Sequence, residues 1–165
     1  MGNLPLYALR VVLALVLAGS VFVQVVMVPL LAIDLDELTA DHAYLRTPLL
    51  VFAVLSIVTI QVVLVCVWRL LTMVRRGTVF SDAAFRYVDV VIGAITAASL
   101  LTFALGVVLA PGEAVAPGVV LLIGGAAVLI AGIALIVLVM RMLLAQAVAR
   151  DAEAHHLQAE LDEVI

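Results

Sequence analysis

The sequence has no lysine and a single cysteine, and charged residues make up only 12% of its 165 residues. One cysteine, Cys66, excludes an internal disulfide, and we expect it to be a small buried apolar side chain. Hydrophobic residues reach 67% and the mean hydropathy is +1.38, whereas soluble domains hold about 45–50% apolar residues. The composition therefore excludes a single water-soluble core and predicts that lipid is the solvent for much of the chain.

Patterns of catalytic and nucleotide-binding sites are also missing. No Ser/His/Asp, Cys/His or HExxH arrangement can be assembled, and the stretch "VRRGTVFSDAAF", residues 74–85, lacks the GxxxxGK[ST] pattern of a phosphate-binding loop. His155 and His156 are adjacent, so on a helix they point about 100° apart and cannot chelate one metal together. We therefore expect no enzymatic activity, no cofactor and no metal.

One connector is acidic and contains a histidine. A calcium loop needs oxygen ligands at alternate positions and a glycine, but Leu38 stands at the third ligand position and the glycine is absent. A solvated loop is favoured, with a weak ion or proton sensor as the alternative. The residues concerned are Asp34, Asp36, Glu37, Asp41 and His42.

Four apolar runs are long enough to cross a bilayer, which takes about 20 residues of helix. They cover approximately residues 7–33, 48–71, 87–110 and 118–140. The pattern predicts an all-α integral membrane protein with a transmembrane domain over residues 1–140 and a polar tail over residues 141–165.

The arginines are sorted to one side of this four-span scheme. Because cytoplasmic loops carry the excess of basic residues, we expect both termini and the central loop to be cytoplasmic. Together with a bias toward Ala, Val and Arg, this suggests a bacterial cytoplasmic membrane. Arg46 alone falls on the other side; the seven that agree are Arg10, Arg69, Arg75, Arg76, Arg86, Arg141 and Arg150.

Small residues recur along the third and fourth spans and predict close packing between them. The ridge of the third span is Ala94, Ala98, Thr102 and Gly106; the fourth carries Gly124, Gly125, Ala127, Ala131, Gly132 and Ala134. The short link over residues 111–117 makes the two spans antiparallel neighbours. A homodimer contact is the alternative use of these residues.

The tail is predicted to continue the fourth helix, because neither Gly nor Pro occurs after Gly132. At 1.5 Å per residue it would project up to about 38 Å. Apolar residues at steps of three and four give it an amphipathic seam that ends in acidic residues. The seam is Leu143, Ala147, Ala154, Leu157, Leu161 and Val164.

Asp89 is the one acidic residue close to the interior of a span. It has two candidate partners, Arg86 three residues earlier and Arg69 across the membrane interface. Structural pairing is favoured over a role in gating or signalling.

The loop between the second and third spans is interpreted as a helix-to-helix turn. Arg75 and Arg76 meet anionic headgroups, Gly77 permits the turn, Phe80 dips into the interface and Ser81 caps the next helix.

This loop also carries a resemblance. "GTVFS", with Gly77, Phe80 and Ser81, and the ending "LDEVI" resemble the YoaS-like family of small four-helix bacterial membrane proteins, domain of unknown function 2975. The resemblance implies a partner, because members often lie beside a gene for a very small helix-turn-helix regulator of the Xre type.

We therefore expect a non-enzymatic membrane regulator or sensor that binds such a regulator through its tail and inner loop, without contacting nucleic acid directly. The alternative is a transporter or channel component, or an accessory subunit, that acts as a homo-oligomer. The expected partner-binding residues are Leu157, Glu160, Leu161, Asp162, Glu163, Val164 and Ile165.

Overall fold

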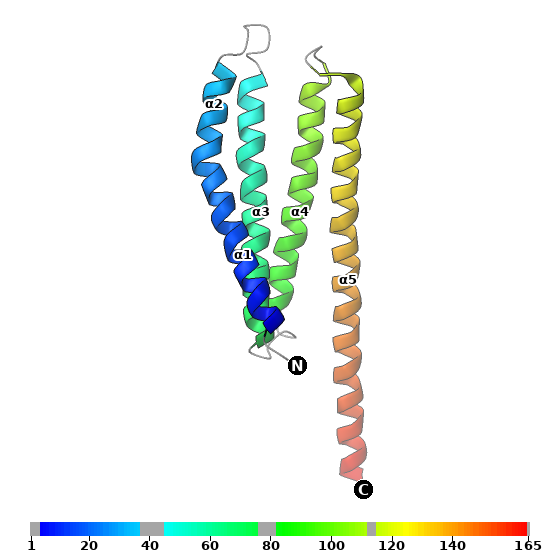
Figure 1. Ribbon diagram of the computed structural model, residues 1–165. Helices are drawn as coiled ribbons and strands as arrows, with labels where there is room; N and C mark the ends of the chain where they lie inside the picture. Colours follow the sequence, from blue (N-terminus) through cyan, green and yellow to red (C-terminus); the bar gives the residue numbers. More distant parts are fainter. Residues whose placement is uncertain (1–3, 37–44, 76–81, 112–114, 165) are drawn as a thin grey trace.

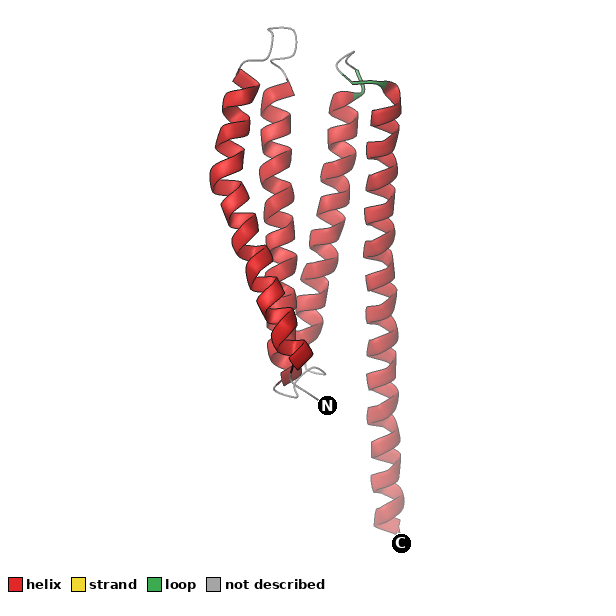
Figure 2. Ribbon diagram, viewed as in Figure 1, coloured by secondary structure: helices red, strands yellow, loops and turns green. Residues whose placement is uncertain are grey.

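The computed structural model describes residues 4–36, 45–75, 82–111 and 115–164, and nearly all of them are helical (Figures 1 and 2). Helix α1 (Leu4–Phe22) leads through a π-helical turn, η1 (Val23–Met27), into α2 (Val28–Asp36). Three long helices follow: α3 (Arg46–Arg75), α4 (Asp82–Leu109) and α5 (Pro117–Val164). Helix α5 runs through residue 140 without a break, so the tail described to Val164 continues the fourth span.

Four helical segments are long and apolar enough to cross a membrane, which confirms the predicted class of fold. They are Tyr7–Asp34, Arg46–Val74, Ala83–Leu109 and Pro117–Ala154. Successive segments are antiparallel, so the start of α1 and the end of α5 lie at the same end of the molecule (Figure 1).

The helices form an open row rather than a closed bundle. Helix α4 packs extensively against both α3 and α5, whereas α1 and α2 make a smaller contact with α3 (Figure 1). No large side chain among the described residues is fully buried, and leucines such as Leu121 and Leu129 are more than 70% exposed. In a protein of this kind, lipid acyl chains cover the exposed apolar side chains.

The π-helical turn in the first span has a local cause at Pro29. Proline has no amide hydrogen, and its ring collides with the carbonyl four residues earlier. The chain widens just before it, and the amide of Val28 donates to the carbonyl oxygen of Val23, five residues back. The apolar run over residues 7–33 predicts one span here, and Pro29 is the sequence signal for the widened turn within it.

The tightest contact in the row is between α4 and α5. The hydroxyl of buried Ser99 donates a 2.8 Å hydrogen bond to the carbonyl oxygen of Ala127, which is 3% exposed. A Cβ atom added at Gly106 would lie 3.3 Å from Cγ2 of Ile123. Ala134 is also buried, but Gly124, Gly125 and Gly132 have open space where a Cβ would stand. Only part of the small-residue pattern therefore serves this contact.

Gly106→Leu is expected to lower the free energy of unfolding by about 1–3 kcal/mol, the usual range for overpacking a close contact. The matched control is Gly93→Leu in the same helix, because a Cβ there meets nothing within 4 Å. Unfolding of the two variants in detergent micelles can be followed by circular dichroism. Equal stability of the two variants would show that α4 and α5 do not approach closely at Gly106.

Candidate functional site

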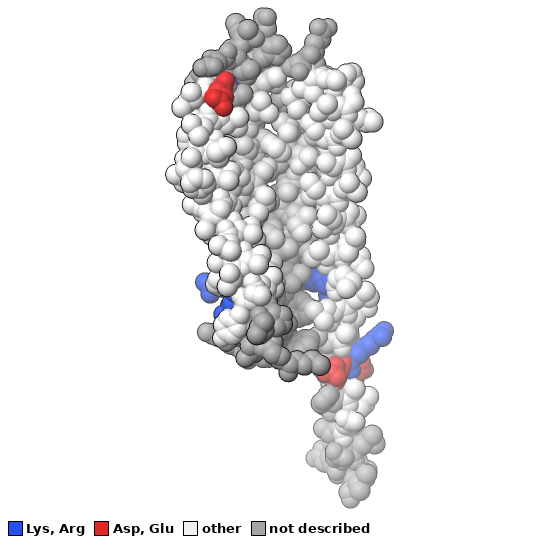
Figure 3. All heavy atoms as spheres, in the orientation of Figure 1, with Lys and Arg blue, Asp and Glu red and all other residues white. Residues whose placement is uncertain are grey.

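Four of the described arginines lie toward one end of the membrane-spanning row, whereas Arg46 begins α3 at the other end. We call the end with the four arginines the basic end and define it by Arg10 of α1, Arg69 of α3, Arg86 of α4 and Arg141 of α5. In Figure 3 the blue atoms lie toward this lower end, where the tail leaves the row. The acidic residue of the basic end is Asp89, so these five residues carry a net charge of +3, four positive charges against one negative.

Asp89 and Arg141 form an ion pair that joins α4 to α5. Nη2 of Arg141 donates a 2.7 Å hydrogen bond to Oδ2 of Asp89. Nε of Arg141 lies 2.5 Å from Oδ1, so the guanidinium contacts both carboxylate oxygens. The Arg141 side chain is 28% exposed and that of Asp89 49%. The guanidinium carbon also lies 5.8 Å from the ring centroid of Phe85. The tail therefore begins at an arginine that contacts both Asp89 and Phe85 of α4.

This pairing differs from the two that the sequence suggested for Asp89. Arg86 is exposed one turn away on the same helix, and Arg69 belongs to α3. Arg141 reaches Asp89 because α5 is antiparallel to α4 and brings its residue 141 level with residue 89. In the sequence Arg141 stands at the start of the polar tail, and nothing in the pattern marks it as the partner of Asp89.

A second contact at the basic end joins α1 to α3. Nη2 of Arg10 donates a 3.0 Å hydrogen bond to Oγ1 of Thr72, and its guanidinium carbon lies 5.9 Å from the Trp68 ring centroid. The Nε atom of Arg10 is buried and has no hydrogen-bond partner. The positive charge of Arg10 is thus held by neutral groups.

A polar cluster lies deeper in the same helix pair, beside the π-helical turn. Nε2 of Gln61 donates to Oε1 of Gln24 at 3.0 Å and to Oγ of Ser20 at 3.4 Å. Interhelical bonds of this kind in lipid contribute about 0.6–2 kcal/mol. The cluster fixes the register of α1 on α3 and contains no ionisable group.

A hollow of about 480 Å³ lies where α3 and α5 flank α4. Its polar groups are the hydroxyls of Ser56, Thr59 and Thr102, two of which donate to carbonyl oxygens within their own helices. Apolar side chains line the remainder, so this hollow offers no charged group to bind an ion. No group of three His, Cys, Asp or Glu that could hold a metal occurs in the described ranges.

Many of the predicted site residues fall outside what the structure describes. Residues 76–81 of the loop and Ile165 lie outside the described residues, as do residues 37–44 of the acidic connector. Arg75 ends α3, and residues 160–164 belong to α5 by backbone alone. Leu157 is the predicted partner-binding residue whose side chain is described, and it is 54% exposed.

Comparison with known families gives one result. The profile of a family described as "Protein of unknown function (DUF2975)" matches residues 30–165, most of the chain, and the protein belongs to this family. The comparison with curated proteins and that with solved structures gave no match. The resemblance seen in the loop and the chain ending thus identified the correct family.

Asp89→Asn and Arg141→Gln are each expected to destabilise the protein, and a double-mutant cycle should give a coupling of about 0.5–1 kcal/mol, as for partly exposed ion pairs. The coupling should shrink in about 1 M salt, where the screening length is about 3 Å. Unfolding in mild detergent measures each variant, and Arg86→Gln in place of Arg141→Gln is the control. Strict additivity of Asp89→Asn and Arg141→Gln, or coupling of Asp89 to Arg86, would contradict the pairing.

Proposed function

We propose that the protein is a non-enzymatic membrane regulator that holds a small cytoplasmic DNA-binding partner on the tail of α5. The observation that carries the proposal is the length of this helix, 48 residues without a break. From Arg141 to Val164 it adds about 35 Å at 1.5 Å per residue, and Figure 1 shows it extending beyond the ends of the other helices. A long exposed helix on a membrane anchor is suited to binding another protein.

The chemistry of the tail indicates the kind of partner. After Arg150 the chain has no lysine or arginine, two histidines, and five acidic residues, Asp151, Glu153, Glu160, Asp162 and Glu163. Exposed Leu157 supplies an apolar side chain among them. A DNA-binding domain presents a basic face, so it is complementary to this surface. A very small helix-turn-helix protein of the Xre type is the partner we propose.

The proposal requires that the basic end and the tail face the cytoplasm of a bacterial cell. The distribution of arginine supports this orientation through the preference of basic residues for the cytoplasmic side. The loop with Arg75 and Arg76 then lies on the same side as the tail and belongs to the same docking region.

The orientation is tested by cysteine labelling in a Cys66→Ser background. Ala116→Cys, exposed just before α5, should react with a membrane-impermeant maleimide in intact spheroplasts. Gln158→Cys, exposed on the tail, should react only after the membrane is permeabilised. The reverse pattern would place the tail outside the cell and exclude a cytoplasmic partner.

The role of the tail is tested by co-expression with a small Xre-type protein. With the intact chain the partner should sediment with membranes, and removal of residues 160–165 should release most of it. Replacing Glu160, Asp162 and Glu163 by Gln removes the negative charge but keeps the length of the tail, so it distinguishes an effect of charge from an effect of length. Gln158→Ala is the neutral control. A partner that stays on the membrane after the deletion would show that the tail end does not hold it.

A further inference from the structure

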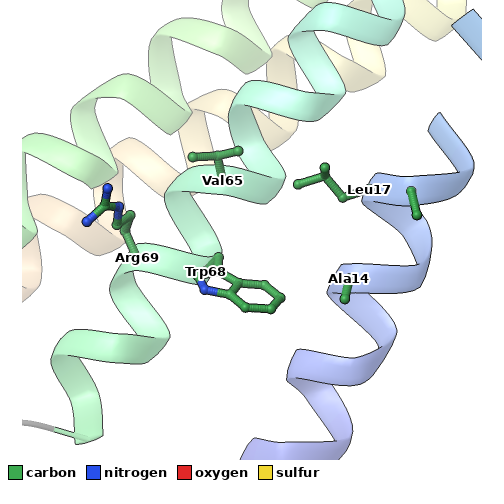
Figure 4. A pocket seen from close by; sticks show the side chains of 6 residues that line it. Ala14, Leu17, Val65, Trp68 and Arg69 are labelled. Carbon is green, nitrogen blue, oxygen red and sulfur yellow. The ribbon is translucent and has the colours of Figure 1, made fainter. Parts of the chain in front are cut away.

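A furrow of about 400 Å³ opens between α1 and α3 next to the basic end. This volume lies within the range of about 300–1,000 Å³ usual for small-molecule sites. Figure 4 shows Ala14 and Leu17 of α1 facing Trp68 of α3, while the Arg69 side chain leaves α3 on the side away from α1. The lining residues are Ala14, Leu17, Ala18, Val65, Trp68 and Arg69.

Small side chains on α1 keep the furrow open. Ala14 and Ala18 are one turn apart and share a face of the helix, and opposite them the sparse contact between α1 and α3 leaves space along the helix pair. The lining is apolar apart from Arg69, whose side chain turns away from α1. An elongated apolar ligand with one polar end therefore suits the furrow.

The charge at the basic end of the furrow is positive among the described residues. Arg69 is exposed and makes no hydrogen bond or ion pair with the described part of the chain. Arg10, one turn below Ala14, has the neutral groups of Thr72 and Trp68 as neighbours. No described acidic side chain lines the furrow. The polar end of the ligand should thus be anionic.

The depth of these residues matches the edge of the hydrocarbon layer. Arg69 lies about nine residues from the middle of α3 (Arg46–Arg75), or about 13.5 Å at 1.5 Å per residue, and half of the hydrocarbon thickness is about 15 Å. Trp68 stands at the same level, where tryptophan is enriched at membrane interfaces. Ala14, Leu17 and Ala18 follow in sequence toward the middle of the first span.

We propose that the furrow between α1 and α3 binds an anionic phospholipid, with one acyl chain along Ala14, Ala18 and Val65 and the phosphate at the basic end, where Arg10 and Arg69 supply positive charge. Guanidinium groups bind phosphate with charge-assisted hydrogen bonds. Basic sites between membrane helices are known to select such headgroups. The site is independent of the tail and of its partner.

Trp68 provides a direct test, because it is the one tryptophan of the chain and lines the furrow. The full-length protein is placed in vesicles of phosphatidylcholine and phosphatidylglycerol in which one or the other lipid carries brominated acyl chains that quench tryptophan. Brominated phosphatidylglycerol should be enriched about fivefold at Trp68 over brominated phosphatidylcholine, from about 1 kcal/mol per arginine.

Two variants divide the proposal into its charged and apolar parts. Arg69→Gln should abolish the preference for phosphatidylglycerol, whereas Arg150→Gln, exposed on the tail, should retain it. Ala14→Leu combined with Ala18→Leu fills the furrow and should reduce quenching by both lipids. Circular dichroism and gel filtration of each variant verify the fold and the oligomeric state.

Three results would overturn the proposal. Equal loss of preference in Arg69→Gln and Arg150→Gln would indicate general attraction to the charged surface. Competition by inorganic phosphate as effective as by phosphatidylglycerol would indicate an anion site without an acyl chain. Unchanged quenching in the filled variant together with a changed oligomeric state would indicate that a second copy of the chain covers the furrow.

Discussion

The antiparallel contact between α4 and α5 determines most of what the structure presents. Asp89 meets Arg141 at one end, Ser99 meets Ala127 near the middle and Gly106 meets Ile123 toward the other end. The residue numbers of the three pairs sum to nearly the same value, so the two helices keep one register over the 17 residues from 89 to 106, about 25 Å of helix. This distance is most of the hydrocarbon thickness. Since α5 is held over that length, its extension beyond Arg141 leaves the row in a defined direction.

The other helix pair is held differently. Arg10 of α1 bonds Thr72 of α3 at the basic end, and Gln24 of η1 bonds Gln61 of α3 deeper in the span. Between these two contacts the alanines of α1 leave the furrow open. A close small-residue contact brings backbones together and leaves no room, whereas two separated hydrogen bonds hold a pair of helices apart at a fixed spacing. The α4–α5 pair is therefore closely packed, whereas the α1–α3 pair leaves a furrow between its helices.

The class of fold was predictable from the sequence because hydrophobic length alone decides which segments can cross a membrane. The continuation of α5 was predictable for a similar local reason, the absence of Gly and Pro after Gly132. The partner of Asp89 was not, because it depends on how α5 is aligned with α4, and apolar spans of this kind fit one another in several registers. The widened turn before Pro29 was not predictable either, because a proline can break a helix or be accommodated by a π-helical turn. Which of the two occurs depends on how the neighbouring helices pack. The furrow between α1 and α3 could not be predicted from the sequence either, because alanine at positions 14 and 18 is equally consistent with close packing.

The charges of the basic end and of the tail favour a projecting tail rather than one lying on the lipid surface. Helices that lie in the membrane interface carry basic residues on their polar face, because the cytoplasmic leaflet is negative. Beyond Arg150 this tail carries acidic residues instead, and anionic lipid gathered at Arg69 would increase its repulsion from the surface. The same lipid would neutralise an arginine that could otherwise attract the acidic tail back onto the row. In the proposed orientation, an anionic lipid bound at the basic end and the acidic residues of the tail would repel each other. This repulsion would keep the end of α5 away from the membrane surface and exposed to a basic partner.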